Sequence, residues 1–179
     1  NHETLAALFD SCVLISDATL RAKFQPLLVD ALGGPIPVHL RQAAMRTLPL
    51  TGPDNAPANF ALLTEALLKG EQRSTSASAL MQLPRAAWDR TKAKAVTDSI
   101  LAYAKTVPAT QRTQQDYVEV AQFGMEVATL LPGDEASRIR KALRELGVSV
   151  FVIKTVREQM RYDTTQLTVE GEKPCEVIF

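Results

Sequence analysis

The spacing of apolar residues changes at Gly147, and this change constrains the fold more than any other feature of the sequence. Before Gly147, apolar residues recur every three or four positions, as they do on the buried face of a helix. After it, Val148 to Ile153 is a mostly β-branched apolar run, which is typical of a strand buried on both faces. The sequence therefore predicts a mainly α protein with a helical domain over 1–147 and a short β segment over 148–179.

We expect about seven or eight helices before Gly147, packed as antiparallel pairs. One of the clearest apolar stripes has steps of three and four residues: Ala93, Val96, Ile100, Tyr103 and Val107. The last helix carries acidic residues at its start and basic residues at its end, which suits the helix dipole. Gly147 follows that helix, where we expect a left-handed cap. Pro26 interrupts an earlier helical pattern and predicts a kink or a break there.

Three residues of the helical region carry specific packing predictions. Gly124 lies on an apolar helix face, where it costs about 1 kcal/mol relative to alanine. We expect the close approach of a neighbouring helix to compensate for that cost. Trp88, the one tryptophan, precedes a helix start and is expected to fill a junction between two repeats rather than to stack on a ligand. Arg41 is expected to point outward.

A weak internal repeat runs through the helical region. Ala44–Pro49 returns 35 positions later as Ala79–Pro84, and a partial third copy ends at Leu131-Pro132, another 48 positions on. Spacings of this size are typical of solenoids built from helical hairpins. We therefore interpret residues 1–147 as a degenerate, HEAT-like array, with an orthogonal bundle of unrelated helices as the alternative.

Composition argues against several classes of function. The chain has 20 basic and 20 acidic residues and no net charge, so it offers no basic surface for a nucleic-acid backbone. No stretch approaches the 18 or more apolar residues that a membrane span needs. With 46% hydrophobic residues, the chain is also too apolar for a disordered segment.

Residues that could perform catalysis or bind a metal are few and scattered. The sequence has no glycine-rich phosphate loop, no Gly-x-Ser-x-Gly, no His-Glu-x-x-His and no Cys-x-x-Cys. His2 and His39 have no acid or cysteine at ligand spacing, and we interpret both as solvated or capping residues. Cys12 and Cys175 are interpreted as small buried apolar side chains. We predict no catalytic, cofactor-binding or metal-binding residue, and a protein that is not an enzyme.

Charged residues of the last helix have a structural interpretation as well. Asp134 and Glu135 are neighbours on the helix and do not face each other, so they make a poor carboxylate pair. Their place in the first turn already explains them. The basic residues of this helix, interspersed with acids, are interpreted as a solvated face: Arg138, Arg140, Lys141 and Arg144.

From Met160 onward the sequence resembles the opening strands of a cupredoxin, the plastocyanin and azurin class of blue-copper domain. The matching residues are Tyr162-Asp163, Leu167-Thr168-Val169, Gly171, Pro174 and Val177-Ile178-Phe179, with one extra residue between Gly171 and Pro174. The helical part resembles a linker region in large secreted proteins. Those proteins similarly combine a sugar-dehydrogenase-like propeller, HEAT-like helices, a cupredoxin and sometimes a cytochrome c. Its matching residues are Trp88, Tyr103 to Pro108, Arg112 and Leu131-Pro132.

The resemblance implies that 148–179 are the first strands of a truncated cupredoxin-like domain, leaning on the last helix near Leu143 and Leu146. In that family the copper ligands come after this segment, so copper is implied for residues beyond Phe179 and no ligand is carried over to this sequence. The implied function is a non-catalytic scaffold that positions an electron-transfer domain in a periplasmic or extracellular protein. The implied partners are neighbouring domains of the same polypeptide. Two alternatives stay open: a protein-binding solenoid, and an enzyme with an active site between helices.

Overall fold

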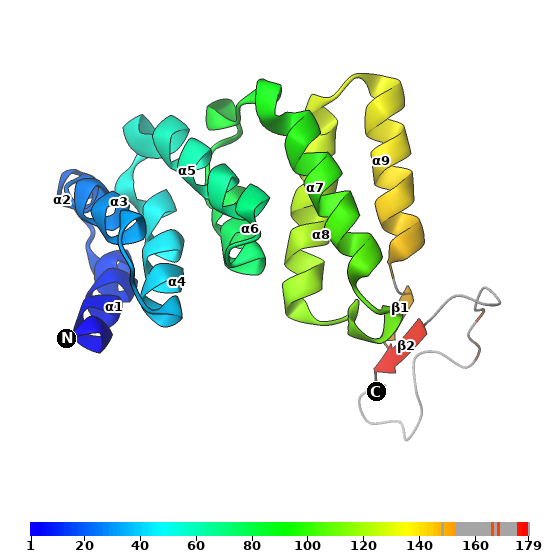
Figure 1. Cartoon of the computed structure of the whole chain (residues 1–179), viewed down its shortest axis with the longest axis horizontal. Coiled ribbons are helices and arrows are strands. Elements are labelled where there is room, and N and C mark those ends of the chain that lie inside the picture. The colour runs from blue at the N-terminus through cyan, green and yellow to red at the C-terminus, as the bar shows by residue number, and fades with distance from the viewer. Residues whose placement is uncertain (148, 153–165, 167, 169–174, 179) are drawn as a thin grey trace, which may run out of the picture.

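A computed structural model of the chain describes residues 1–147, 149–152, 166, 168 and 175–178. Helices make up most of this described part, which confirms the prediction of a mainly α protein. The helices stand side by side along the long axis of the molecule, and a pair of short strands comes after the last of them (Figure 1).

The bounds of the elements agree broadly with the predicted pattern. The α-helices of the described part are α1 (His2–Asp10), α2 (Ala18–Ala22), α3 (Gln25–Gly33), α4 (Val38–Thr47), α5 (Ala56–Lys69), α6 (Arg73–Gln82), α7 (Ala93–Thr106), α8 (Gln115–Val127) and α9 (Gly133–Leu146). Short 3-10 turns connect them: η1 (Ser11–Leu14), η2 (Leu48–Thr51), η3 (Pro53–Asn55), η4 (Arg85–Ala87), η5 (Arg90–Lys92), η6 (Ala109–Gln111) and η7 (Ala128–Leu130).

Successive helices form antiparallel hairpins that stack on one another (Figure 1). α3 packs on α4, α5 on α6, and α7 on α8. The second helices of these hairpins form a continuous row, because α6 contacts α4 on one side and α8 on the other. α1 extends the row beyond α4, and α9 packs against both α7 and α8. Each hairpin is thus covered by its neighbours in the stack.

The copies of the sequence repeat occupy the same position in successive hairpins. Each Leu-Pro pair comes directly after, or within a few residues of, the end of α4, α6 or α8. Leu48 and Leu83 are buried, and Leu131 is partly buried against the same core. Leu83 and Leu131 are extended, and the proline after each of them has no N–H with which to continue a helix. The repeated residues therefore lie at or just beyond the C-terminal end of the second helix of each hairpin, where their leucines pack against the core.

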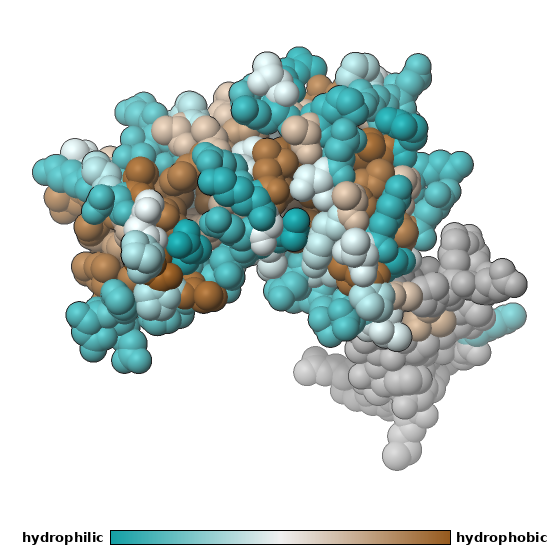
Figure 2. All heavy atoms as spheres, viewed as in Figure 1, coloured by the Kyte–Doolittle hydropathy of each residue, from teal (hydrophilic) through white to brown (hydrophobic). Residues whose placement is uncertain are grey.

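The hydrophobic core runs through the whole stack of hairpins. Its largest fully buried side chains come from all parts of the helical region: Phe9, Leu28, Leu40, Met45, Leu48, Phe60, Leu63, Leu67, Leu80, Ile100, Phe123 and Ile139. At the N-terminal end, three leucines remain 44–48% exposed: Leu8, Leu20 and Leu27. α1, α2 and α3 have neighbouring helices on one side only, and hydrophobic side chains are visible over this end of the molecule (Figure 2).

Close packing explains the roles of Gly124 and Trp88. A Cβ atom on Gly124 would lie 2.8 Å from Cγ2 of Ile100 in α7 and 3.1 Å from Cδ1 of Leu143 in α9. This confirms that the glycine allows neighbouring helices to approach α8. Trp88 is buried at a junction between hairpins, between Phe60 of α5 and Phe123 of α8, as predicted.

Pro26 and Gly147 had predicted backbone roles, of which the structure confirms one. The chain breaks between α2 and α3, and Pro26 lies at the start of α3, where its missing N–H costs nothing. The left-handed cap predicted at Gly147 is wrong, because this residue is extended, with φ −67° and ψ 162°, where the chain leaves α9 toward a strand. The left-handed glycine cap is found instead after α5, at Gly70, where φ is 82°.

Two short strands come after the helices. β1 (Ser149–Val152) and β2 (Cys175–Ile178) pair in parallel, with Ser149 opposite Cys175 and Val152 opposite Ile178. The expected strand around Leu167 and Val169 lies outside the described residues. Cys175 is exposed, so the prediction that it is buried inside a strand is wrong. A parallel pair of this size does not form a core by itself.

The contacts of Gly124 predict the effect of adding one methyl group. Gly124→Ala should lower the free energy of unfolding by about 1–2 kcal/mol, because Cγ2 of the β-branched Ile100 cannot easily move away. This loss should exceed the gain from the better helix propensity of alanine. The measurement is equilibrium unfolding in urea. Gly133→Ala is the matched control, because no atom lies within 4 Å of its added Cβ, and a loss of similar size in both variants would contradict the packing argument.

Candidate functional site

The residues considered as catalytic or metal ligands are dispersed over the fold. His2 lies at the exposed start of α1, and His39 lies in the exposed first turn of α4. In the part of the chain that the structure describes, no group of three or more His, Cys, Asp and Glu residues could hold a metal ion. None of the helices described there combines the length and the apolar character that a membrane crossing needs.

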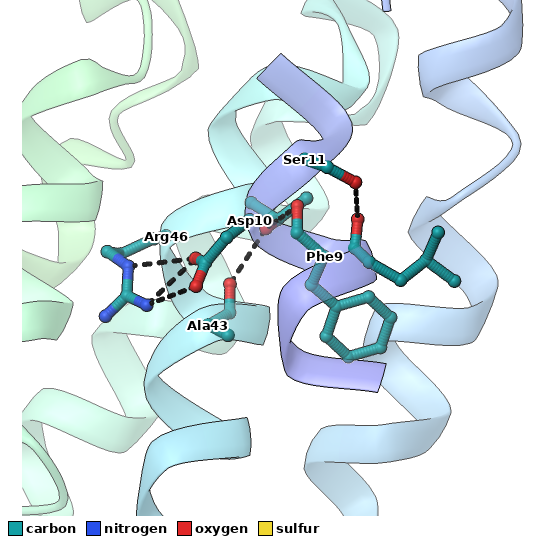
Figure 3. A network of polar contacts seen from close by, with 7 residues as sticks. Phe9, Asp10, Ser11, Ala43 and Arg46 are labelled. Atoms are coloured by element: carbon teal, nitrogen blue, oxygen red, sulfur yellow. Dashed lines mark hydrogen bonds and ion pairs between the residues drawn. The ribbon is translucent and has the colours of Figure 1, made fainter. Parts of the chain in front are cut away.

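Polar contacts join each helix of the row to the next, and the first of these joins α1 to α4 (Figure 3). The Arg46 guanidinium binds both carboxylate oxygens of Asp10, with Nη2 2.8 Å from Oδ1 and 3.0 Å from Oδ2. Beneath this pair, the buried Thr47 hydroxyl lies 3.0 Å from the carbonyl oxygen of Phe9 and 2.8 Å from that of Ala43. The contact is therefore charged at the surface and neutral inside.

The other junctions of the row have comparable contacts. Between α4 and α6, Nε2 of Gln42 donates to Oε1 of Gln72 over 2.7 Å. Between α6 and α8, the Ser74 hydroxyl donates to the Glu119 carboxylate. Arg85, just after α6, forms an exposed ion pair with Glu126 of α8. Of these contacts, Arg46–Asp10 and Arg85–Glu126 pair a base with an acid, whereas Gln42–Gln72 and Ser74–Glu119 include no base. These polar side chains are therefore used within the stack and do not form the single-sign or apolar patch expected of a surface that binds a partner chain.

A hollow of about 450 Å³ lies between α3 and α5, above α4. Its walls expose polar and apolar surface in similar amounts, and its charged residues are paired with one another. The lining residues are Val29, Leu32, Gly33, Gly34, Arg41, Met45, Leu62, Leu63, Glu65, Ala66, Lys69 and Glu71. Lys69 Nζ lies 2.7 Å from Oε1 of Glu65, and Arg41 Nη1 lies 3.5 Å from Oε2 of Glu71. With two cations and two anions paired at its rim, the hollow has no charge preference for a ligand.

Arg41 is the residue of this hollow that sequence reasoning misjudged. Its side chain is 22% exposed and turns back over the end of α3, so the prediction that it points outward is wrong. Its guanidinium donates to the carbonyl oxygens of Leu32 and Gly34, each over 3.3 Å. The last carbonyls of a helix lack intrahelical partners, so the Gly33-Gly34 end of α3 was the available signal for such a contact.

The surface of α9 agrees with the interpretation as a solvated face. Its basic residues are exposed: Arg138, Arg140, Lys141 and Arg144. Asp134 is exposed in the first turn, and Glu135 binds Lys94 of α7, with Oε1 3.1 Å from Nζ. The acidic pair therefore has no common target, and one member holds α9 against α7.

Titratable groups in the interior are few, and burial dominates their chemistry. Burial raises the pKa of the Cys12 thiol, and the nearby Arg21 opposes this only in part. Burial likewise raises the pKa of Tyr117, with Arg112 acting in the opposite direction. Both groups are therefore held in their neutral forms at neutral pH, and neither is activated as a nucleophile or a base.

Comparison with protein-family models, with curated proteins and with solved structures found no match for this chain. The HEAT-like and cupredoxin-like assignments therefore stay predictions from sequence.

The two cysteines should differ strongly in their reaction with a thiol reagent at pH 8. Cys175 is exposed and should react within minutes, whereas Cys12 is fully buried with a raised pKa and should react only on unfolding. The measurement is the number of thiols modified over time by a chromogenic disulfide, with Cys12→Ala and Cys175→Ser as matched controls. Rapid modification of both thiols in the folded chain would contradict the described packing of Cys12.

Proposed function

We propose that residues 1–147 are a non-catalytic, HEAT-like scaffold and that 148–179 begin a blue-copper domain which this scaffold positions within a larger redox protein. The observation that carries the proposal is the match between repeat and fold. The copies of the Leu-Pro repeat come at the ends of α4, α6 and α8, the second helices of successive hairpins. A repeat of sequence that is also a repeat of structure is typical of a solenoid.

The polar contacts along the row favour a scaffold over a protein-binding module. They join each helix to its neighbour, through Arg46 and Asp10, Gln42 and Gln72, and then Ser74 and Glu119. Side chains used in this way stiffen the stack and leave fewer polar groups to recognise another chain. An enzyme with its site between helices is supported less, because the charged residues of the hollow between α3 and α5 are paired with one another.

The paired strands support the idea of a β domain that continues past this segment. β1 and β2 run parallel, and parallel sheets are stable when both of their faces are covered. Within the described part of the chain, these two strands do not provide that cover for each other. The cupredoxin-like identity of this domain, its copper, and a periplasmic or extracellular location rest on the sequence resemblance alone. In that resemblance, copper would be held by histidine, cysteine and methionine residues beyond Phe179.

The proposal is tested by comparing this chain with a version that continues through about 100 further residues of the natural protein, the size of a small β-sandwich. Copper(II) is titrated into both, and the visible absorption of a copper–thiolate bond is recorded together with hydrogen exchange. We expect the absorption band in the longer chain only, since the shorter one lacks the ligand set. We also expect stronger amide protection of Ser149–Val152 in the longer chain.

Two outcomes would contradict the proposal. A copper–thiolate band in the shorter chain would mean that Cys12 or Cys175 binds copper, against the predicted absence of ligands. Equal and strong protection of Ser149–Val152 in both chains would mean that the β segment is complete without further strands. A longer chain that takes up no copper would remove the blue-copper part of the proposal and leave the helical scaffold.

A further inference from the structure

Arg112 lies in the connection between α7 and α8, and its side chain contacts the chain at the end of α7 and at the end of α9. Its Nε donates to the carbonyl oxygen of Val107, the residue directly after α7, over 2.9 Å. Its Nη1 donates to the carbonyl oxygen of Leu146, the last residue of α9, over 3.0 Å. One side chain therefore bridges the C-terminal ends of α7 and α9, although 34 positions separate Arg112 from Leu146.

The chemistry of arginine suits this position. Carbonyls at the end of a helix carry partial negative charge and lack intrahelical partners. The guanidinium group is planar, and its donors keep a fixed geometry relative to one another. Two carbonyls that accept from the same guanidinium are therefore held in a fixed relation, which a lysine with its single rotating ammonium cannot impose.

The second of these carbonyls lies directly at the exit from the helical domain. The Leu146 carbonyl and the Gly147 nitrogen belong to one planar peptide unit. Arg112 holds this unit at its oxygen, and the Gly147 N–H donates to the carbonyl oxygen of Arg144 over 3.1 Å. The unit is thus held at both ends, just before the chain turns extended at Gly147 and enters β1.

We propose that Arg112 is a positioning residue, which sets the direction in which the chain leaves the helical domain by tying the end of α9 to the end of α7. The proposal rests on the proposed scaffold function and deepens it, because it names the contact through which the helices would orient the β segment. Arg112 lies at the edge of the fold, and its bonds are partly buried, so its loss should change the exit geometry more than the core.

The test measures the distance between two nitroxide spin labels by pulsed electron paramagnetic resonance in the full 179-residue chain. One label is placed at Gln122→Cys, an exposed position in α8, and the other at Ser149→Cys, the first residue of β1. Cys12→Ala and Cys175→Ser remove the native thiols. We expect a narrow distance distribution in this parent chain and a distribution about two-fold broader in Arg112→Gln, with unchanged helix content by circular dichroism.

Arg90→Gln is the matched control. Nη2 of Arg90 also donates to a carbonyl near a helix end, that of Leu130 over 3.4 Å, but this contact lies before α9 rather than at its exit. Its distribution should stay as narrow as in the parent chain. Arg112→Lys keeps the charge and should give an intermediate width, and it replaces Arg112→Gln as the test if that variant loses helix content.

The outcomes separate the inference from the proposed function. A narrow parent distribution that stays narrow in the folded Arg112 variants would overturn the role of Arg112 and leave the scaffold function standing. A broad distribution in the parent chain itself would also overturn the role of Arg112, because its bonds would then not fix the exit from α9. The scaffold function would still be decided by the copper and hydrogen-exchange comparison with the longer chain. Broadening of equal size in Arg90→Gln would also overturn the inference, since it would reflect a general loosening of the helices.

Discussion

The burial of Trp88 between two hairpins is the interaction on which the continuity of the helical stack depends. Its ring lies 6.1 Å from that of Phe60 in α5 and 5.4 Å from that of Phe123 in α8, centroid to centroid. Its indole N–H donates to the carbonyl oxygen of Leu83 over 3.3 Å, and the Arg85 guanidinium lies 4.3 Å above its ring. Large buried aromatic side chains contribute more to stability than any other residue type of the core, and this one belongs to neither hairpin that it joins.

The stability of a stack of hairpins depends on the contacts between neighbouring hairpins, whereas that of a globular domain depends on one shared core. Each hairpin buries apolar residues against its immediate neighbours. In the solenoid that we propose, stability would be a sum of local contributions that are linked through the junctions. α9 provides one covered end, where Leu143 packs close to Gly124 of α8. At the other end, Leu8 of α1, Leu20 of α2 and Leu27 of α3 are half exposed. The junctions, rather than any single helix, therefore decide whether the helical region behaves as one body.

Local patterns in the sequence predicted several parts of this fold. The helical period indicated the helices, Pro26 indicated the break between α2 and α3, and Gly124 and Trp88 indicated the close contacts. The roles of two other residues were misjudged. Arg41 binds carbonyl oxygens at the end of another helix, and Gly147 is extended where the chain leaves α9 toward β1, which a helix-end rule does not include.

The candidate site was harder to predict than the fold because its contacts join positions far apart in the chain. No spacing rule links Arg112 to Leu146, or Arg46 to Asp10, which lies 36 positions away. Cys175 lies in β2, but the expectation that it is buried there was wrong. Alternation in a β segment shows which residues share a face, and it does not show which face is covered. For the same reason, the apolar pattern after Gly147 indicates a β segment but does not indicate which part of the protein covers it.

The most direct test of a single stacked helical body is native-state hydrogen exchange on the chain and on Trp88→Ala. In the unaltered chain we predict that the most protected amides of α4 and α8 open together, with the same free energy and the same dependence on denaturant. In Trp88→Ala, whose truncation should cost about 3–5 kcal/mol, the amides of α4 and α8 should open in separate transitions. Trp88→Phe keeps an aromatic ring at the junction and should preserve the joint opening at lower stability. If α4 and α8 open separately in the unaltered chain, or still open together in Trp88→Ala, the hairpins are not coupled through this junction and the account is wrong.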